Sequence, residues 1–192
     1  MKKFKMSTSI IIIVVSVAVI VGIYFLLTRH WSNDEKPSDV QVTAVQNVLL
    51  RNIENNYPPT PKEVLKYYSD ITQCFYAGGY TDEELIQLAD RAWDLYDEEL
   101  QANQDYNTYI KDLKAEIADY KKKDWSISSY STSSSLDVEE FERDGHKWAQ
   151  LYAFYNVRQS TKIVKVTERF LMRKDKDGRW KIFGWEQVAG TQ

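Results

Sequence analysis

The sequence has few of the residues that build metal, thiol or disulfide sites. Its 192 residues include one cysteine, Cys74, and two histidines, His30 and His146. A single cysteine cannot form a disulfide within the chain, and a Cys/His zinc site needs about three or four ligands close together. These three residues are far apart in the sequence and show no such spacing. We therefore expect no metal and no cofactor.

Glycine and proline are also scarce, with seven and four residues respectively. This scarcity excludes a collagen-like chain and a low-complexity coil. Hydrophobic residues make up 43% of the sequence and aromatic residues 14%, which is enough to build a core. A chain of this length suits one ordinary domain with an accessory segment.

The formal net charge is only −3, from 25 Lys and Arg against 28 Asp and Glu. Nucleic-acid binders usually carry a basic face, so we expect no nucleic-acid partner. The charge is unevenly distributed, because residues 1–31 hold four basic side chains and no acidic one. Taking those four from the total leaves 21 basic and 28 acidic side chains in residues 32–192, a net charge of −7. Anionic lipid headgroups repel such a surface, so membrane attachment has to come from an apolar segment.

A long hydrophobic run lies near the N-terminus. Ser7–Leu27 contains no charged residue, and as a helix it would rise roughly 31 Å, about the thickness of a hydrocarbon core. Lys2, Lys3 and Lys5 precede it without an acidic residue, and the positive-inside rule then places the N-terminus in the cytoplasm. We expect Ser7–Leu27 to be a single-pass helix in the lipid bilayer of the cell membrane, with the C-terminal domain outside.

A cleaved signal peptide is the competing interpretation. Its apolar region usually spans only about 7–15 residues and ends at a small-x-small site. The triplet of that kind, Ser16-Val17-Ala18, lies inside the apolar run, so a cut there would leave too little apolar sequence before it. We therefore favour an uncleaved anchor. The predicted parts are a basic tail at 1–6, the transmembrane helix at 7–27, a linker at 28–39 and an extracytoplasmic domain at 40–192.

Four amphipathic helical patterns open the extracytoplasmic domain. They lie at residues 38–56, 60–77, 81–100 and 106–123. Thr60-Pro61-Lys62-Glu63 and Thr81-Asp82-Glu83-Glu84 are capping boxes that start the second and third helices. Gly78-Gly79 supplies the left-handed residue that ends the second helix.

After Asp124 the hydrophobic period changes from about 3.6 to 2, which indicates strands. The strand patterns lie at Trp125–Tyr130, Lys147–Arg158, Lys162–Arg173 and Arg179–Val188. Residues 174–178 form a hairpin loop that ends in Gly178, and Gly184 in the last strand indicates a bulge or bend. The predicted fold class is therefore α+β, with about four helices packed on a curved antiparallel sheet of about four strands.

Strand alternation selects three candidate catalytic residues. With a period of two, Tyr152, Glu168 and Glu186 are assigned to the mainly apolar face that packs on the helices. Burial there would raise the pKa of both glutamates, and Tyr152 would donate a hydrogen bond. The structural alternative is that a bulge at Gly184 turns Glu186 outward and that Glu168 pairs with a neighbouring Lys or Arg.

The closing hairpin resembles that of the nuclear-transport-factor-2-like superfamily. The residues that carry the resemblance are Asp177-Gly178-Arg179-Trp180-Lys181-Ile182-Phe183-Gly184-Trp185-Glu186. The resemblance implies a cone, with helices packed into the concave face of a curved antiparallel sheet. It implies either an isomerase or dehydratase with an acid or base inside the cone, or a non-catalytic scaffold. The chain as a whole is similar to single-span exported bacterial proteins that carry such a domain.

These features predict a membrane-anchored, extracytoplasmic module that binds a protein or a ligand. The expected partners are the lipid bilayer and a cell-envelope protein or a second copy of the chain. The alternative is an isomerase-like or dehydratase-like enzyme with an acidic residue in a cone-shaped pocket. An enclosed cavity lined by a few convergent polar groups would distinguish binding or catalysis from a filled scaffold.

Overall fold

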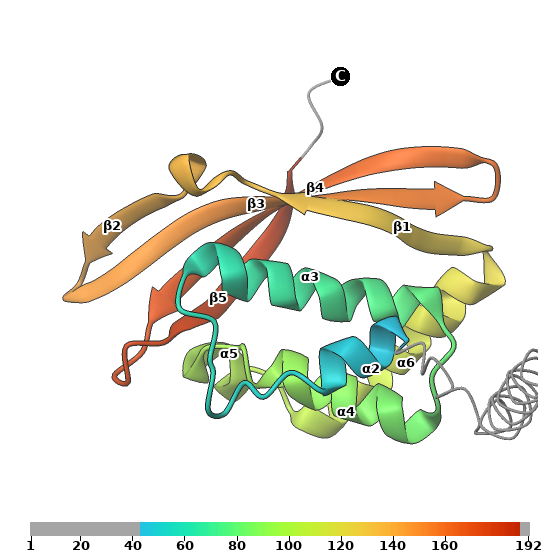
Figure 1. The fold of residues 1–192 in the computed structure, drawn as a ribbon, viewed down its shortest axis with the longest axis horizontal. Coiled ribbons are helices and arrows are strands. Elements are labelled where there is room, and N and C mark those ends of the chain that lie inside the picture. Colours follow the sequence, from blue (N-terminus) through green and yellow to red (C-terminus); the bar gives the residue numbers. More distant parts are fainter. Residues whose placement is uncertain (1–42, 189–192) are drawn as a thin grey trace, which may run out of the picture. The chain divides into compact units, whose positions relative to one another are not determined.

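A computed structural model describes residues 43–188. In it five helices are followed by a five-stranded antiparallel sheet (Figure 1). The helices are α2 (Ala44–Leu49), α3 (Pro61–Ala77), α4 (Asp82–Trp93), α5 (Glu98–Ala102) and α6 (Tyr106–Lys122). The strands are β1 (Trp125–Thr132), β2 (Glu139–Arg143), β3 (His146–Gln159), β4 (Lys162–Lys174) and β5 (Trp180–Val188), with a short 3-10 helix at Ser135–Asp137. The α+β class and the order of helices before strands are confirmed.

The predicted membrane span, Ser7–Leu27, lies outside the described residues, as do the tail at 1–6 and the linker at 28–39. Within residues 43–188, every helix is too short or too polar to cross a membrane.

Local capping signals set the ends of α3 and the start of α4. The Thr60 hydroxyl accepts the Glu63 N–H at 3.2 Å, and Pro61 occupies the first helical position, where no N–H is needed. Gly78, just after α3, has a φ of 74°, a positive value that glycine adopts without strain. Thr81 forms a full capping box with Glu84 at the start of α4. These predicted boundaries are confirmed.

The first predicted helix is shorter than the sequence pattern indicates. The expectation was a helix over 38–56, but α2 ends at Leu49, and the following residues form turns in which the Asn52 side chain accepts the Asn55 N–H at 3.1 Å. Ile53 is still buried. The apolar spacing over 38–56 therefore indicates which side chains are buried against α3 and α4, and does not indicate a continuous helix.

The third predicted helix, over 81–100, is interrupted. Helix α4 ends at Trp93, and Leu95–Asp97 runs alongside β5 before α5 begins. The Asp97 N–H donates to the Ile182 carbonyl and the Ile182 N–H donates to the Leu95 carbonyl, both at 2.8 Å. These bonds pair the backbone N–H and carbonyl of Ile182 on the edge strand β5, and a continuous helix over 81–100 would not form them. Pairing with a distant strand therefore overrides the helical pattern.

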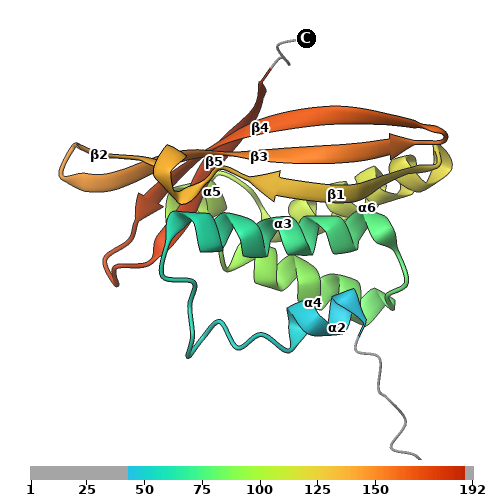
Figure 2. The same ribbon diagram turned by 45° about the horizontal axis from the view of Figure 1, so that its top comes forward.

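The sheet has the strand order β1-β3-β4-β5, and β2 also pairs with β3. Strand β3 is long enough for both partners: residues 146–150 pair with β2, and residues 153–159 pair with β1. The views agree that the helices all lie on one side of this sheet (Figures 1 and 2). Sequence analysis missed β2, in which all five residues are exposed and leave little hydrophobic alternation.

The inner face of β3 is the opposite of the predicted one. The inner side chains are Ala149, Leu151, Ala153, Tyr155 and Val157, all of them buried. Tyr152 and Phe154 therefore lie on the outer face, which corrects the assignment of Tyr152 to the core side. Both faces of this strand carry apolar side chains, so alternation alone does not decide which face is buried.

The predicted bulge in β5 is present. Leu171 pairs with Gly184, but Met172 pairs with Ile182, so Phe183 is an extra residue on β5. Side chains before the bulge, such as Ile182, keep the predicted inward orientation. Side chains after the bulge face the opposite way from the prediction, so Trp185, opposite Phe170, lies inward and Glu186, opposite Arg169, lies outward. This corrects the assignment of Glu186 to the core side.

A buried ion pair joins the helical layer to the sheet. Arg173 on β4 donates to both carboxylate oxygens of Asp97, at 2.5 and 3.0 Å, and also donates to Glu99 at 2.6 Å. The Asp97 and Arg173 side chains are only 3% and 9% exposed. The guanidinium also lies over the rings of Trp148 and Phe183. This ion pair therefore joins the α4–α5 connection to strand β4.

We predict that Asp97→Asn destabilises the domain by about 3–5 kcal/mol, because it removes the buried carboxylate from the guanidinium of Arg173 and leaves only the exposed carboxylate of Glu99. Chemical denaturation followed by circular dichroism measures this change. The control is Glu186→Gln, which removes the exposed partner of Arg169 and should have a much smaller effect. Equal effects of the two substitutions would contradict the role given to Asp97.

Candidate functional site

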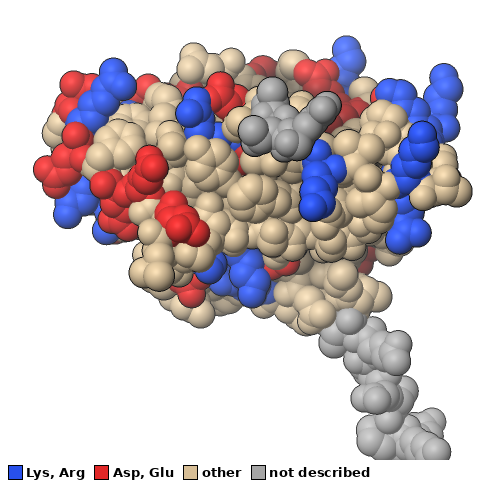
Figure 3. Space-filling view, turned by 90° about the horizontal axis from the view of Figure 1, so that it is seen from above, with Lys and Arg blue, Asp and Glu red and all other residues tan. Residues whose placement is uncertain are grey.

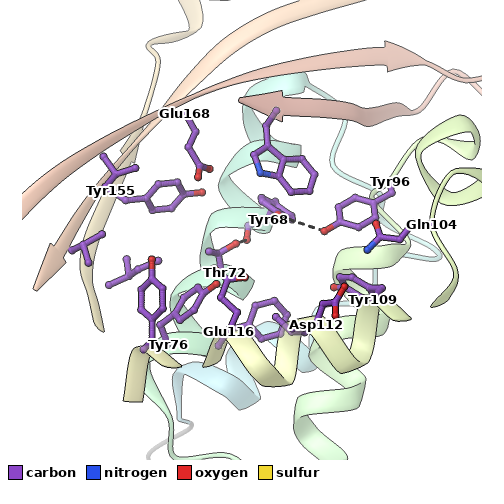
Figure 4. A pocket seen from close by; sticks show the side chains of 17 residues that line it. Tyr68, Thr72, Tyr76, Tyr96, Gln104, Tyr109, Asp112, Glu116, Tyr155 and Glu168 are labelled. Atoms are coloured by element: carbon purple, nitrogen blue, oxygen red, sulfur yellow. Dashed lines mark hydrogen bonds between the residues drawn. The ribbon is translucent and has the colours of Figure 1, made fainter. Parts of the chain in front are cut away.

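A cavity of about 280 Å³ lies between helices α3 and α6 and the inner face of the sheet (Figure 4). Its walls come from both layers of the fold, because α3, α6, β1, β3, β4 and β5 contribute side chains. The lining is rich in tyrosine and contains three carboxyl groups. The tyrosines are Tyr68, Tyr76, Tyr96, Tyr109, Tyr120 and Tyr155.

Helical spacing explains how the two helices present these groups. Tyr68, Thr72 and Tyr76 are four residues apart on α3 and therefore share one face. On α6, Asp112, Glu116 and Tyr120 are also four residues apart and face the cavity from the other side. The rings of Tyr76 and Tyr120 meet across this gap, with centroids 4.3 Å apart.

The tyrosine hydroxyls form polar contacts inside the cavity region. The hydroxyls of Tyr68 and Tyr96 are 3.4 Å apart (Figure 4), and those of Tyr155 and Ser69 are 3.0 Å apart. Burial is the main cause that raises the pKa of Tyr68, Tyr96 and Tyr155 above the ordinary value of 10. These phenols are therefore neutral near pH 7 and can donate or accept hydrogen bonds.

Glu168 is the acidic group that reaches into the cavity from the sheet. It lies on β4 opposite Ala153, and its carboxyl points toward the tyrosines (Figure 4). Burial raises the pKa of this carboxyl from 4.5 to about 7, and the negative charge of Glu116 contributes to the rise. Glu168 therefore changes its protonation state near neutral pH.

The open side of the cavity is acidic and aromatic. Asp112 and Glu116 line the cavity and are also exposed to solvent, as is Trp185, which is 41% exposed. The cavity lining contains no Lys, Arg or His. Across residues 43–188, the ion pairs formed involve none of the three cavity carboxyl groups.

Comparison with known protein families gives a match over most of the chain. The family described as Domain of unknown function (DUF6715) matches residues 1–185. The chain belongs to the DUF6715 family. The match extends over nearly the whole chain, including the predicted membrane span at Ser7–Leu27. A search of curated proteins gave no match.

Of the three predicted site residues, this DUF6715 domain places one in the cavity. Glu168 lines it, whereas Glu186 lies on the outer face and pairs with Arg169. Tyr152 also lies on the outer face, opposite Arg169 in the β3–β4 register and stacked against Phe154. The three residues are therefore not brought together. The alternative pairing of Glu168 with a Lys or Arg is also absent among the described residues.

The outer face of the DUF6715 sheet differs from the cavity in its charges. Acidic and basic side chains are mixed across it, and basic ones gather toward the β3–β4 hairpin (Figure 3). Arg158, Lys162 and Lys165 lie at that end of the two strands. The acidic character of the cavity is therefore local and does not extend over the whole domain.

Sequence analysis missed most of the cavity residues. Tyr155 was not selected, because the strand pattern put Tyr152 on the inner face of β3, and Tyr96 was expected within the helix over 81–100. The four-residue spacing of Asp112, Glu116 and Tyr120 was a usable signal, since it places two carboxyl groups on one helix face beside an aromatic ring. Within residues 43–188, no group of three or more His, Cys, Asp or Glu side chains is arranged to hold a metal.

We predict that Glu168 titrates near pH 7 and that Glu116→Gln lowers the pKa of Glu168, because one nearby negative charge is removed. Carbon-13 NMR of the labelled glutamate carboxyl groups measures both values. A pKa of Glu168 near 4.5 in the folded protein would contradict the burial of this group.

The same shift makes stability depend on pH. The pKa of Glu168 is higher in the folded state than the unfolded value of 4.5, so between pH 4.5 and about 7 the folded state holds more protons and stability falls as the pH rises. We expect Glu168→Gln to raise the melting temperature relative to wild type at about pH 8 and to have less effect at about pH 5. Glu186→Gln, on the outer face, should show no such pH-dependent gain.

Proposed function

We propose that this protein is a membrane-anchored, extracytoplasmic module that binds a small ligand. The observation that carries the proposal is the tyrosine-lined cavity of about 280 Å³ between the helices and the sheet. Ligand sites are typically concave, mostly apolar and equipped with a few convergent polar groups. Aromatic rings supply the apolar walls here, and Glu168, Glu116 and the phenol hydroxyls supply the polar groups.

We also propose that the domain is a cone of the nuclear-transport-factor-2-like kind. Support comes from helices that lie on one face of a bulged antiparallel sheet and from a cavity between the two layers. In such a cone the inner sheet face and the helices form the walls of the site.

The anchor is proposed from the sequence. Support comes from the uncharged run at Ser7–Leu27, the basic residues before it and the net charge of −7 after it. Tethering would hold the ligand site outside the cell.

An enzyme is the second candidate, and the raised pKa of Glu168 favours it. A carboxyl with a pKa of about 7 can accept and return a proton near neutral pH, as an isomerase or dehydratase requires. Its neighbour Tyr155 points toward the same cavity and can donate a hydrogen bond to a developing negative charge.

Two valine variants test ligand binding in the cavity, one that fills it and one that serves as the control. The full chain in a non-ionic detergent is screened by thermal shift against a panel of small metabolites. A ligand at about 100 times its Kd stabilises the protein by about 2.7 kcal/mol. We expect Val166→Phe, which fills the cavity, to abolish that stabilisation. Val164→Phe should retain it, because Val164 is two residues along the same strand and does not line the cavity.

The screen has two informative contrary outcomes. No stabilising compound, or a compound that stabilises Val166→Phe as well as wild type, would contradict binding in this cavity. A compound recovered as an isomer or a dehydration product, with the reaction lost in Glu168→Gln, would support the enzyme alternative instead.

The anchor has its own test in the full chain. We predict that the wild-type protein stays with membranes after an alkaline wash. The double variant Ile13→Lys/Val17→Lys should be released, because each lysine near the centre of the span costs about 2.5–3.5 kcal/mol. The control is Ile13→Leu/Val17→Leu, which keeps the segment apolar. Release of the wild-type protein by the wash would contradict a transmembrane anchor.

A further inference from the structure

We propose that the ligand of this cavity is an organic cation, a small substituted ammonium compound. The inference rests on the proposed ligand-binding function and names the chemical class of the ligand. It is carried by the charges of the cavity, by its aromatic rings and by the distribution of cations over the rest of the domain.

The cavity combines negative charge with the absence of any positive side chain. Asp112 and Glu116 lie at its open side, and Glu168 lies further in. The lining contains no Lys, Arg or His. An anionic ligand would meet three carboxyl groups with no compensating charge, whereas a cation is attracted by all of them.

The walls of the cavity contain several aromatic rings, and cations bind to the faces of such rings. Trp185 at the open side lies 5.7 Å from Tyr96 and 5.8 Å from Tyr68 between ring centroids. Tyr76 and Tyr120 form a second pair. Several rings around one site attract a quaternary or substituted ammonium group through their negative faces, and this interaction strengthens when the ion loses water.

Elsewhere in the domain, cations already cover aromatic rings. The cation–π contacts among the described residues involve the rings of Tyr57, Tyr67, Trp125, Trp148, Trp180 and Phe183. None of these six rings lines the cavity. The cavity is therefore lined by aromatic and acidic side chains, and within residues 43–188 no Lys, Arg or His side chain lies among them.

A metal ion fits this site poorly. Calcium and magnesium need several oxygen ligands at about 2.0–2.6 Å, and the described residues provide no cluster of three or more acidic or metal-ligating side chains arranged to hold a metal. The aromatic walls also suit an ion that gives up water easily. Substituted ammonium ions need no cluster of oxygen ligands, and they lose water easily because they carry apolar groups and spread their charge.

Binding of a cation should be coupled to the protonation of Glu168. Four titratable groups face it: Glu116 and Tyr120 from α6, Tyr76 from α3 and Tyr155 from β3. Burial keeps the pKa of each of these tyrosines above 10. Glu168, with a pKa of about 7, is neutral in part of the molecules at pH 7. A bound cation favours the ionised carboxylate, so affinity should rise with pH.

The test is calorimetric titration of the full chain in a maltoside detergent. The probes are choline and tetramethylammonium, with 3,3-dimethyl-1-butanol as the neutral compound of the same shape as choline. We expect both cations to bind, and the neutral compound to bind at least about tenfold more weakly. The affinity for choline should increase between about pH 6 and 8.

Substitutions connect this binding to the proposed residues. Glu168→Gln should weaken choline binding about tenfold at pH 8 and remove its pH dependence, whereas Glu186→Gln on the outer face should leave both unchanged. Trp185→Phe keeps an aromatic face and should retain binding, while Trp185→Leu should weaken it. Circular dichroism confirms that each variant is folded.

The ammonium group could belong to a free compound or to a lipid headgroup. Titration with soluble short-chain lipids distinguishes these two sources. Binding of choline alone indicates a free ligand. Binding of dihexanoylphosphatidylcholine but not of choline indicates a headgroup, and either result supports an ammonium site. Equal binding of dihexanoylphosphatidylglycerol, which has no ammonium group, would overturn the inference.

The outcomes also distinguish this inference from the proposed function. If the neutral compound binds as well as choline, the cavity binds ligands by shape and the inference of a cation fails. The inference also fails if neither the two cations nor dihexanoylphosphatidylcholine binds while the binding of another compound is lost in Val166→Phe, and in that case the proposed function survives. If no compound of any kind depends on Val166, both fail.

Discussion

The contact between Asp97 and Arg173 is the interaction on which the shape of this domain depends. It is buried, it uses both carboxylate oxygens, and Asp97 also accepts the Glu99 N–H that starts α5. It holds Leu95–Asp97 beside β5, as a parallel neighbour of the edge strand. Tyr96 lies in the middle of that segment, so the same contact places its ring against Tyr68 and Trp185. A structural ion pair thus positions one wall of the cavity.

The cavity exists because the two layers are packed closely at one end only. Along β4, Met172 and Phe170 are fully buried, Glu168 and Val166 are partly buried, and Val164 is 38% exposed. An apolar residue at position 168 would avoid the cost of burying a carboxyl, so Glu168 is the kind of local conflict that is typical of functional sites.

Sequence patterns predicted those elements whose signals lie within a few residues. Thr60, Pro61 and Gly78 set the ends of α3, and Gly184 indicated the bulge in β5. The face of β3 was wrong because Tyr152 and Tyr155 are equally suited to a core, and only the packing of α3 decides between them. The consequence for the site was direct: Glu168 was assigned to the correct face, whereas Tyr152 and Glu186 were not.

The sequence by itself determined the order of helices and strands, the positions of caps and turns, and the separation of a basic, apolar N-terminal segment from an acidic remainder. Each of these depends on neighbouring residues, or on composition alone. The tertiary structure decided the break between α4 and α5, the inward direction of Tyr155, and the meeting of Glu168 with Glu116 and the tyrosines. These depend on contacts between residues distant along the chain, such as Asp97 with Arg173, which no local pattern records.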